Sequence, residues 1–153
     1  MKEVRGLLDY TDNWELPDVK IFTGNATVKS NGELVMGRGA ALQVRDNHRG
    51  ISKALGTLIK PQLVVGNEFY GFALCQAASP RQLIGIFQVK TYYSNFADIE
   101  LIQRSTNMLK QIAEAKPQLI FHMNYPGIGH GKLKYKHIQD IVSILPDNVI
   151  LYK

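Results

Sequence analysis

The sequence has little cysteine, no long apolar run and no low-complexity segment, and each shortage excludes a class of protein. The single cysteine, Cys75, cannot form a disulfide within the chain and favours a reducing compartment. No segment reaches the roughly 18 consecutive apolar residues that cross a bilayer, and residues 1–18 lack the apolar core of a signal peptide. We therefore expect an ordered, cytoplasmic protein without a membrane partner.

The familiar motifs for nucleotides, metals and nucleic acids are absent as well. The sequence contains neither the Gly-Lys-Ser/Thr ending of a Walker loop nor the full glycine fingerprint of dinucleotide-binding proteins. No pair of its four histidines has metal-ligand spacing with a third donor, so we expect no metal and no cofactor. His122, within a predicted strand, is expected to be a satisfied structural residue. No known nucleic-acid-binding motif occurs either.

What the chain does have is an ordinary globular composition with a surplus of positive charge. Its 153 residues suit one domain spanning 1–153, with 45% hydrophobic and 20% charged residues. The net charge of +5 favours an anionic partner, since excess Lys and Arg attract phosphates over long distances. Lys132, Lys134 and Lys136 form the densest basic group, which either faces a phosphate or is solvated.

Apolar periodicity predicts alternating strands and helices. Runs of β-branched and apolar residues predict strands at 4–9, 19–24, 62–65, 69–77, 83–89, 118–123 and 148–153. Helical spacing predicts helices at 39–48, between 50 and 60, at 98–115 and from 138 to 145. This alternation is typical of an α/β protein with helices on both sides of a mixed sheet. Ligands of such sheets bind where loops leave the carboxyl ends of the strands.

A first glycine-rich loop leads from an irregular segment into a predicted helix. It consists of Met36, Gly37, Arg38, Gly39 and Ala40. Glycines allow the backbone to approach a ligand closely, and the free amides at the start of a helix attract anions. These five residues are candidate ligand contacts, and a plain tight turn is the alternative interpretation.

A second loop follows the predicted strand at 118–123. It consists of Gly127, Ile128, Gly129, His130 and Gly131. Its three glycines create a trough without side chains, whose amides can wrap a diphosphate. His130 could donate to a phosphate or act as acid and base, since histidine titrates near neutral pH. The alternative is a purely structural turn. Two such loops in one sheet predict a cleft for an elongated anion.

Together these features resemble the macro-domain family, most closely its branch of terminal ADP-ribose protein glycohydrolases and enzymes that remove ADP-ribose from DNA. Residues 4–6 (VRG) resemble the family's opening strand, 31–46 (NGELVMGRGAALQVRD) its first ligand loop, and 125–131 (YPGIGHG) its diphosphate loop. The resemblance implies a three-layer α/β/α sandwich with a mixed central sheet, and a cleft for ADP-ribose or an ADP-ribosylated macromolecule. It also implies that Asn25 and the first loop lie near the distal ribose and that the second loop wraps the diphosphate.

The chemistry departs from the family pattern in three places. Leu7 stands where relatives have an aspartate that reads the adenine amine. Lys90 matches the lysine that attacks the sugar in the glycohydrolase branch, which makes it the candidate catalytic residue; a solvated strand end and a phosphate contact are its other interpretations. The aspartate that assists this lysine has no counterpart, because 132–134 reads Lys-Leu-Lys. The predicted strand at 19–24 also lacks the histidine of phosphatase-type relatives.

The sequence leaves three functions open. The first is binding of ADP-ribose or an ADP-ribosylated group between the two loops, with at most weak ADP-ribosyl hydrolysis. The second is catalysis, as an ADP-ribose 1″-phosphate phosphatase or an active ADP-ribosyl glycohydrolase. The third is a basic nucleic-acid-binding module in which the glycine-rich loops and lysines hold successive phosphates, which aromatic residues near basic ones allow. The candidates for stacking on an adenine or the distal ribose are Tyr92, Tyr93, Phe96 and Tyr125, although core packing is expected for the first three.

Overall fold

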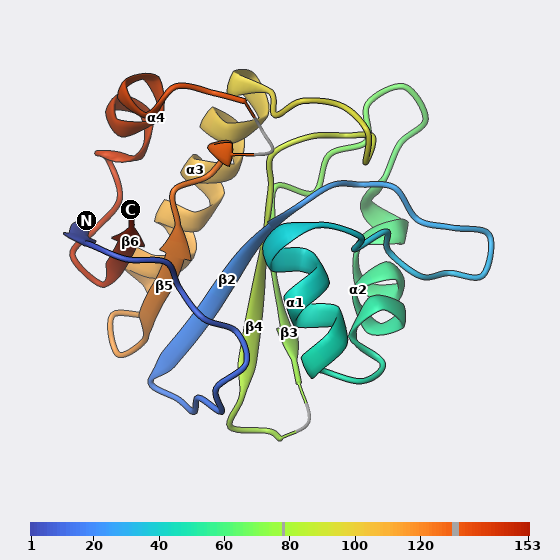
Figure 1. Ribbon diagram of the computed structural model, residues 1–153, viewed down its shortest axis with the longest axis horizontal. Helices are drawn as coiled ribbons and strands as arrows, with labels where there is room; N and C mark the ends of the chain where they lie inside the picture. The colour runs from blue at the N-terminus through green and yellow to red at the C-terminus, as the bar shows by residue number, and fades with distance from the viewer. Residues whose placement is uncertain (78, 130–131) are drawn as a thin grey trace.

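A mixed sheet forms the centre of the molecule. The computed structural model describes residues 1–77, 79–129 and 132–153, and within them the sheet has six strands (Figure 1). The strands are β1 (Lys2–Val4), β2 (Asp18–Gly24), β3 (Phe72–Gln76), β4 (Leu83–Gln88), β5 (Ile120–Asn124) and β6 (Val149–Tyr152). Their order is β1-β6-β5-β2-β4-β3, and every neighbouring pair is parallel except β3 and β4, which are antiparallel.

Helices cover both faces of this sheet. They are α1 (Gly39–Asn47), α2 (Ile51–Ile59), α3 (Ile99–Ala115) and α4 (Tyr135–Val142), with a short 3-10 helix, η1 (Lys60–Gln62), after α2. Figure 1 shows α1 and α2 on one side of the sheet and α3 and α4 on the other, which confirms the predicted three-layer α/β/α arrangement. None of the helices in the described ranges combines the length and the apolar character needed to cross a bilayer.

Each face of the sheet has its own hydrophobic core, because strand side chains alternate in direction. In β2, Val19 and Ile21 are buried in the core under α3 and α4, whereas Phe22 is buried in the core under α1 and α2. Helix α3 contributes Ile102 to the first core, and α2 contributes Leu55 to the second. Side chains buried in this way stabilise the fold by about 1.5 to 3 kcal/mol each.

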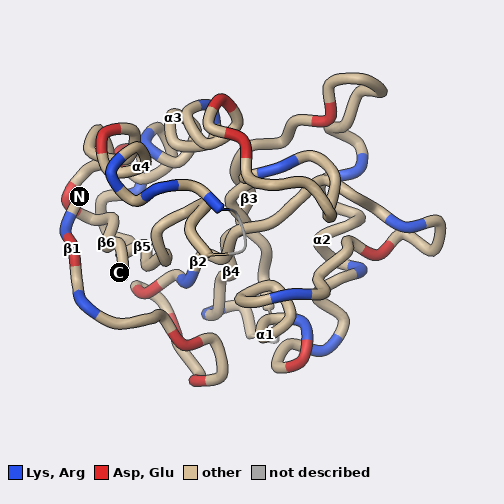
Figure 2. The backbone as a smooth tube through the Cα atoms, turned by 45° about the horizontal axis from the view of Figure 1, so that its top comes forward, with Lys and Arg blue, Asp and Glu red and all other residues tan. Residues whose placement is uncertain are grey.

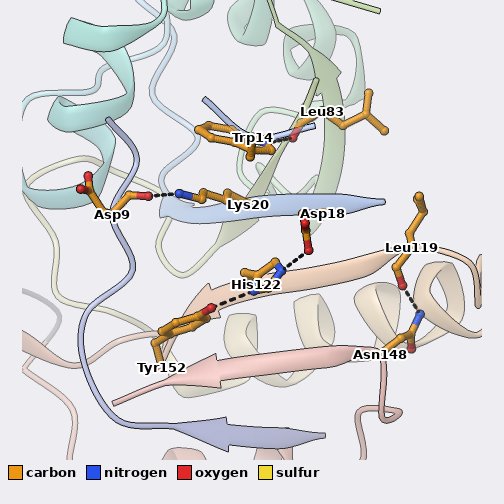
Figure 3. A network of polar contacts seen from close by, with 9 residues as sticks. All are labelled: Asp9, Trp14, Asp18, Lys20, Leu83, Leu119, His122, Asn148 and Tyr152. Atoms are coloured by element: carbon orange, nitrogen blue, oxygen red, sulfur yellow. Dashed lines mark hydrogen bonds and ion pairs between the residues drawn. The ribbon is translucent and has the colours of Figure 1, made fainter. Parts of the chain in front are cut away.

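The N-terminal segment, residues 5–17, has no helix or strand and crosses one face of the sheet (Figure 1). Trp14 Nε1 donates to the carbonyl oxygen of Leu83 at 2.9 Å, and Lys20 Nζ donates to the carbonyl oxygen of Asp9 (Figure 3). Because Lys20 lies on β2 and Leu83 on β4, these bonds hold the segment against the sheet. The segment thereby adds Leu8, Tyr10 and Trp14 to the core under α1 and α2.

His122 on β5 is a satisfied structural residue, as predicted. Its Nε2 lies 2.8 Å from Asp18 Oδ1, and its Nδ1 lies 2.9 Å from the hydroxyl of Tyr152 (Figure 3). In a neutral imidazole one nitrogen donates and the other accepts, so with Nε2 donating to the Asp18 carboxylate, Nδ1 accepts from Tyr152. This chain of three side chains connects β2, β5 and β6.

Two predicted elements have the wrong extent. The strand expected at 4–9 ends at Val4, because Gly6 has a φ of +111° and turns the chain out of the extended conformation. The last helix, expected to reach 145, ends at Val142, and the following residues form a turn.

The strand expected at 62–65 is absent. This stretch is the end of η1 and the turn that follows it, where only an isolated bridge joins Val64 to Asn67. The apolar, β-branched composition of this stretch predicted a strand, but Val65 is 98% exposed. The remaining predicted elements are present, with ends that shift by a few residues.

Candidate functional site

A cleft of about 880 Å³ opens at the carboxyl ends of β2, β4, β5 and β6. Parallel strands bring these ends to one edge of the sheet, so segments far apart in the sequence meet there. The walls come from the two glycine-rich loops, the residues after β4, and the N-terminal segment. The volume lies within the range of about 300 to 1,000 Å³ that is typical of small-molecule sites.

The first loop forms one wall of the cleft. Four of its residues line the cleft: Gly37, Arg38, Gly39 and Ala40. Arg38 precedes α1 with an extended backbone, and no side chain caps the first amides of this helix. A side chain built onto Gly37 would meet no atom within 4 Å, so this position is open. The wall therefore offers free amide groups and a guanidinium to a ligand.

Met36 does not line the cleft, contrary to its prediction as a ligand contact. Its side chain is buried in the core under α1 and α2, and the hydroxyl of Ser52 lies 3.5 Å from its sulfur. An unbranched apolar side chain fills such a gap between helices well. Val35 before Met36 and the loop residues after it line the cleft.

The second loop forms the opposite wall. Gly127, Ile128 and Gly129 line the cleft, and both glycines have positive φ angles, +80° and +73°. A side chain on Gly127 would come within 2.8 Å of Ile102 and 2.9 Å of Leu133, so this glycine allows the loop to pack on the core. A side chain on Gly129 would meet no atom within 4 Å. His130 and Gly131, also predicted contacts, lie outside the described residues.

Asn25 lines the cleft directly after β2 and is itself buried. Its Nδ2 donates to the carbonyl oxygen of Val35 at 3.0 Å, and its Oδ1 accepts from the amide of Thr27 at 2.8 Å. The side chain therefore holds the irregular segment before the first loop in position. One hydrogen of Nδ2 has no partner among the described residues.

Lys90 lines the cleft two residues after β4 and is half-buried. Burial lowers the pKa of its amine below the ordinary value, and the nearby guanidinium of Arg38 lowers it further. Both causes disfavour the charged form, which increases the fraction of nucleophilic neutral amine at a given pH.

The charges in the cleft all have the same sign. Its charged lining residues within the described ranges are Arg38, Lys90 and Lys153, with no Asp or Glu among them. Figure 2 shows further lysines on the stretch that follows the second loop and enters α4; these are the exposed Lys132, Lys134 and Lys136. A concave surface of one charge sign concentrates ligands of the opposite sign, so this cleft favours an anion.

The same architecture occurs in solved macrodomain structures. The macrodomain of Mycobacterium tuberculosis DarG is 19% identical, with 98% of this chain and 96% of that chain covered and a TM-score of 0.75. The macrodomain of Thermus aquaticus DarG is 18% identical, with coverage of 99% and 95% and a TM-score of 0.69. This chain has the macrodomain fold. The predicted resemblance is thereby confirmed at the level of the fold.

A longer protein also contains this macrodomain fold. The structure of Thermosipho africanus DarTG in complex with ADP-ribose is 16% identical over 88% of this chain, with a TM-score of 0.66. The chain spans only 37% of that DarTG chain. No family model and no curated protein sequence matches the chain.

Asn124, which was not among the predicted site residues, lines the cleft at the end of β5. Its Oδ1 accepts the amide hydrogen of Leu8 at 2.9 Å, which fastens the N-terminal segment to this end of the cleft. A polar residue at the carboxyl end of a central strand was a usable signal. Tyr152 and Lys153 at the end of β6 also line the cleft and carried the same signal.

The aromatic residues after β4 were predicted to pack in the core, and this prediction is wrong. Tyr92, Tyr93 and Phe96, in the loop before α3, are 48%, 45% and 67% exposed. Of these three, Tyr93 lines the cleft. Tyr125 also lines it, but its hydroxyl donates to Glu3, and burial raises the pKa of this phenol above its ordinary value.

Metal-ligating side chains do not gather in the described part of the macrodomain. No three His, Cys, Asp or Glu side chains there lie close enough together to hold an ion. The site chemistry therefore rests on backbone amides, three cations, amides of Asn side chains and phenols.

Proposed function

We propose that the cleft binds ADP-ribose or an ADP-ribosylated group. The observation that carries this proposal is that two loops with open glycines, Gly37 and Gly129, face a cleft whose charged lining residues are all cationic. Backbone amides beside such glycines suit phosphates, which accept several hydrogen bonds at once. The ADP-ribose complex of DarTG, a protein containing the same fold, supports the choice of ligand.

The sheet order supports one orientation of the ligand. The second loop follows β5, which lies between β2 and β6, so a diphosphate held by this loop occupies the middle of the cleft. One riboside then extends toward Asn25 and Lys90, and the other toward Leu7 and Lys153. We place the distal ribose at the Lys90 end and the base at the Leu7 end, as the resemblance to macro domains implies.

The first prediction tests the ligand site at Gly37. Its φ lies outside the left-handed region and its neighbourhood is open, so Gly37→Glu leaves the fold intact while inserting a carboxylate into the cleft. We expect the affinity for ADP-ribose, measured by calorimetry, to fall at least about tenfold, because the new charge repels the diphosphate. Ala54→Glu on the exposed side of α2 is the matched control and should bind like the wild type.

Two results would contradict the proposal. The first is unchanged affinity in folded Gly37→Glu, which removes the first loop from the site. The second is that a short single-stranded oligonucleotide binds as tightly as ADP-ribose and loses its affinity steeply with salt. That behaviour is typical of phosphate contacts along a nucleic acid and would favour the basic nucleic-acid-binding module.

A further inference from the structure

The loop between β4 and α3, residues 90–97, is closed at its base and fastened to the rest of the protein. The amide of Asp98 donates to the carbonyl oxygen of Val89 at 2.7 Å, so the two ends of the loop lie side by side. The amide of Tyr93 donates to Thr27 Oγ1 at 2.9 Å, which attaches the middle of the loop to the segment after β2. Compact surface loops whose ends meet in this way often have a function.

This loop presents three aromatic side chains to the surface. Tyr92, Tyr93 and Phe96 are all exposed, and the rings of the two tyrosines lie against each other with centroids 4.7 Å apart. Single exposed apolar side chains are common in proteins, whereas neighbouring ones on a fixed loop are typical of a surface that a partner contacts. The faces of aromatic rings also attract cations.

The loop separates two hollows of opposite charge. On one side, Lys90, Tyr93 and Ser94 line the cationic cleft. On the other side, Thr91 and Asp98, at the two ends of the loop, line a second hollow of about 210 Å³. The charged residues that line this second hollow are Glu68, Asp98, Glu100 and Arg104, and we call it the acidic hollow.

The acidic hollow keeps a negative charge because its carboxylates are not neutralised. Within residues 1–77, 79–129 and 132–153, no ion pair involves Glu68, Asp98 or Glu100. The guanidinium of Arg104 instead lies over the ring of Phe69, 3.7 Å from its centroid. Three carboxylates against one guanidinium favour a cationic group from a partner and repel phosphates.

We propose that the aromatic loop, residues 90–97, is the docking surface for the macromolecule that carries the ADP-ribosyl group, and that this macromolecule is a protein with Lys or Arg beside its modified residue. This inference rests on the proposed function. A partner that continues from the cleft across the loop reaches the acidic hollow, because the loop lies between the two. A basic side chain is attracted there by the aromatic rings and by the carboxylates. A nucleic acid would bring its phosphates against the same carboxylates.

The test is calorimetry with four ligands in the same buffer. They are free ADP-ribose, a short peptide with ADP-ribose on a central serine flanked by lysines, the same peptide with glutamates in place of the lysines, and an ADP-ribosylated single-stranded oligonucleotide. We expect the lysine peptide to bind about threefold to tenfold more tightly than free ADP-ribose, the range that exposed ion pairs and cation–π contacts supply. The glutamate peptide should bind no more tightly than free ADP-ribose. The net charge of +5 would by itself produce the opposite order, so general attraction cannot explain this result.

Three variants separate the docking surface from the cleft. Glu100→Gln removes one charge from the acidic hollow, and Phe96→Ser removes an exposed ring that does not line the cleft. Each should weaken binding of the lysine peptide by roughly twofold to fivefold and leave binding of free ADP-ribose unchanged. Glu114→Gln removes the same charge from an exposed position at the other end of α3, and this control should bind both ligands like the wild type.

The outcomes distinguish this inference from the proposed function. Equal affinity for the lysine and glutamate peptides overturns the inference alone, as does a preference for the lysine peptide that neither Glu100→Gln nor Phe96→Ser reduces. Tighter binding of the ADP-ribosylated oligonucleotide than of the lysine peptide also overturns it and favours a nucleic acid as the partner. Binding of none of the four ligands overturns the proposed function and this inference with it.

Discussion

Lys90 is a cleft residue whose chemistry is altered by its surroundings. Burial and the adjacent Arg38 lower its pKa, which prepares an amine for nucleophilic attack. Cleavage of a glycosidic bond also needs an acid or base that moves protons at the anomeric carbon, and such help contributes about a hundredfold to ten-thousandfold. No described lining residue is a carboxylic acid. Among the described lining residues, the amine therefore has no carboxylic acid as a partner for turnover.

We predict that binding exceeds catalysis at this site. Time courses with ADP-ribose linked through ester, aspartyl, glutamyl and DNA attachments should show release near background for the wild type and for Lys90→Ala alike. The physical reason is that no carboxylic acid lines the cleft in residues 1–77, 79–129 and 132–153, combined with cations that stabilise the anionic ligand more than the positive charge that develops on the sugar. Rapid release that the alanine substitution abolishes would contradict this and would identify Lys90 as a catalytic residue.

Single residues differ in how far sequence alone could place them. Gly129 and Lys90 follow strands in a recognisable pattern, so local sequence indicated their positions at the cleft. Met36 belongs to an equally recognisable loop, but its side chain is buried in the core under α1 and α2, where it packs with other apolar side chains. The contact between Leu8 and Asn124 spans 116 positions, and no local pattern encodes such a pairing.

Helix α3 shows a complete start signal at the level of an element. Asp98 accepts hydrogen bonds from the amides of Glu100, at 2.9 Å, and Leu101, at 3.5 Å. We predict that Asp98→Ala lowers the free energy of unfolding by about 1 kcal/mol, since it leaves these amides uncapped. Urea denaturation measures the change. Asp98→Asn is the control and should remain close to the wild type, because asparagine caps equally well; an equal loss in both variants would contradict the capping role.

Elements were predictable where periodicity and end signals agreed. Helix α3 combines a cap, a buried face and a stop before Pro117, and its predicted range of 98–115 nearly matches the observed one. The stretch 62–65 had only an apolar composition, and no neighbouring strand was available to pair with it. Strand formation depends on such a partner, which composition does not reveal.

At the scale of the whole molecule, acid should loosen the attachment of the N-terminal segment. His48 packs edge-on against Trp14, with ring centroids 5.0 Å apart, and its Nε2 lies 3.3 Å from the carbonyl oxygen of Tyr10. Burial lowers the pKa of His48 below its ordinary value of 6.5. Between pH 6.5 and the lower pKa that His48 has in the folded protein, the unfolded chain binds more protons than the folded one. Stability is therefore lost as the pH falls through this window.

We predict that the urea concentration at the denaturation midpoint of the wild type decreases when the pH is lowered from 7.5 to 5. It should decrease less in His48→Gln, which removes the titrating ring. The difference between the two proteins isolates His48 from the other groups that titrate in this range. The same pH dependence in both proteins would show that His48 does not carry the effect.

We expect the pairing of β1 with β6 to form late in folding. Lys2 pairs with Ile150, so the first strand finds its neighbour only after almost the whole chain is available, and such distant contacts slow folding. Leu7 and Lys153, which complete the base end of the cleft, lie beside these two strands. A nascent chain that still lacks β6 has the two glycine-rich loops but no finished pocket. Ligand affinity should therefore return last during refolding, only after β1 has paired with β6 and later than the chain becomes compact.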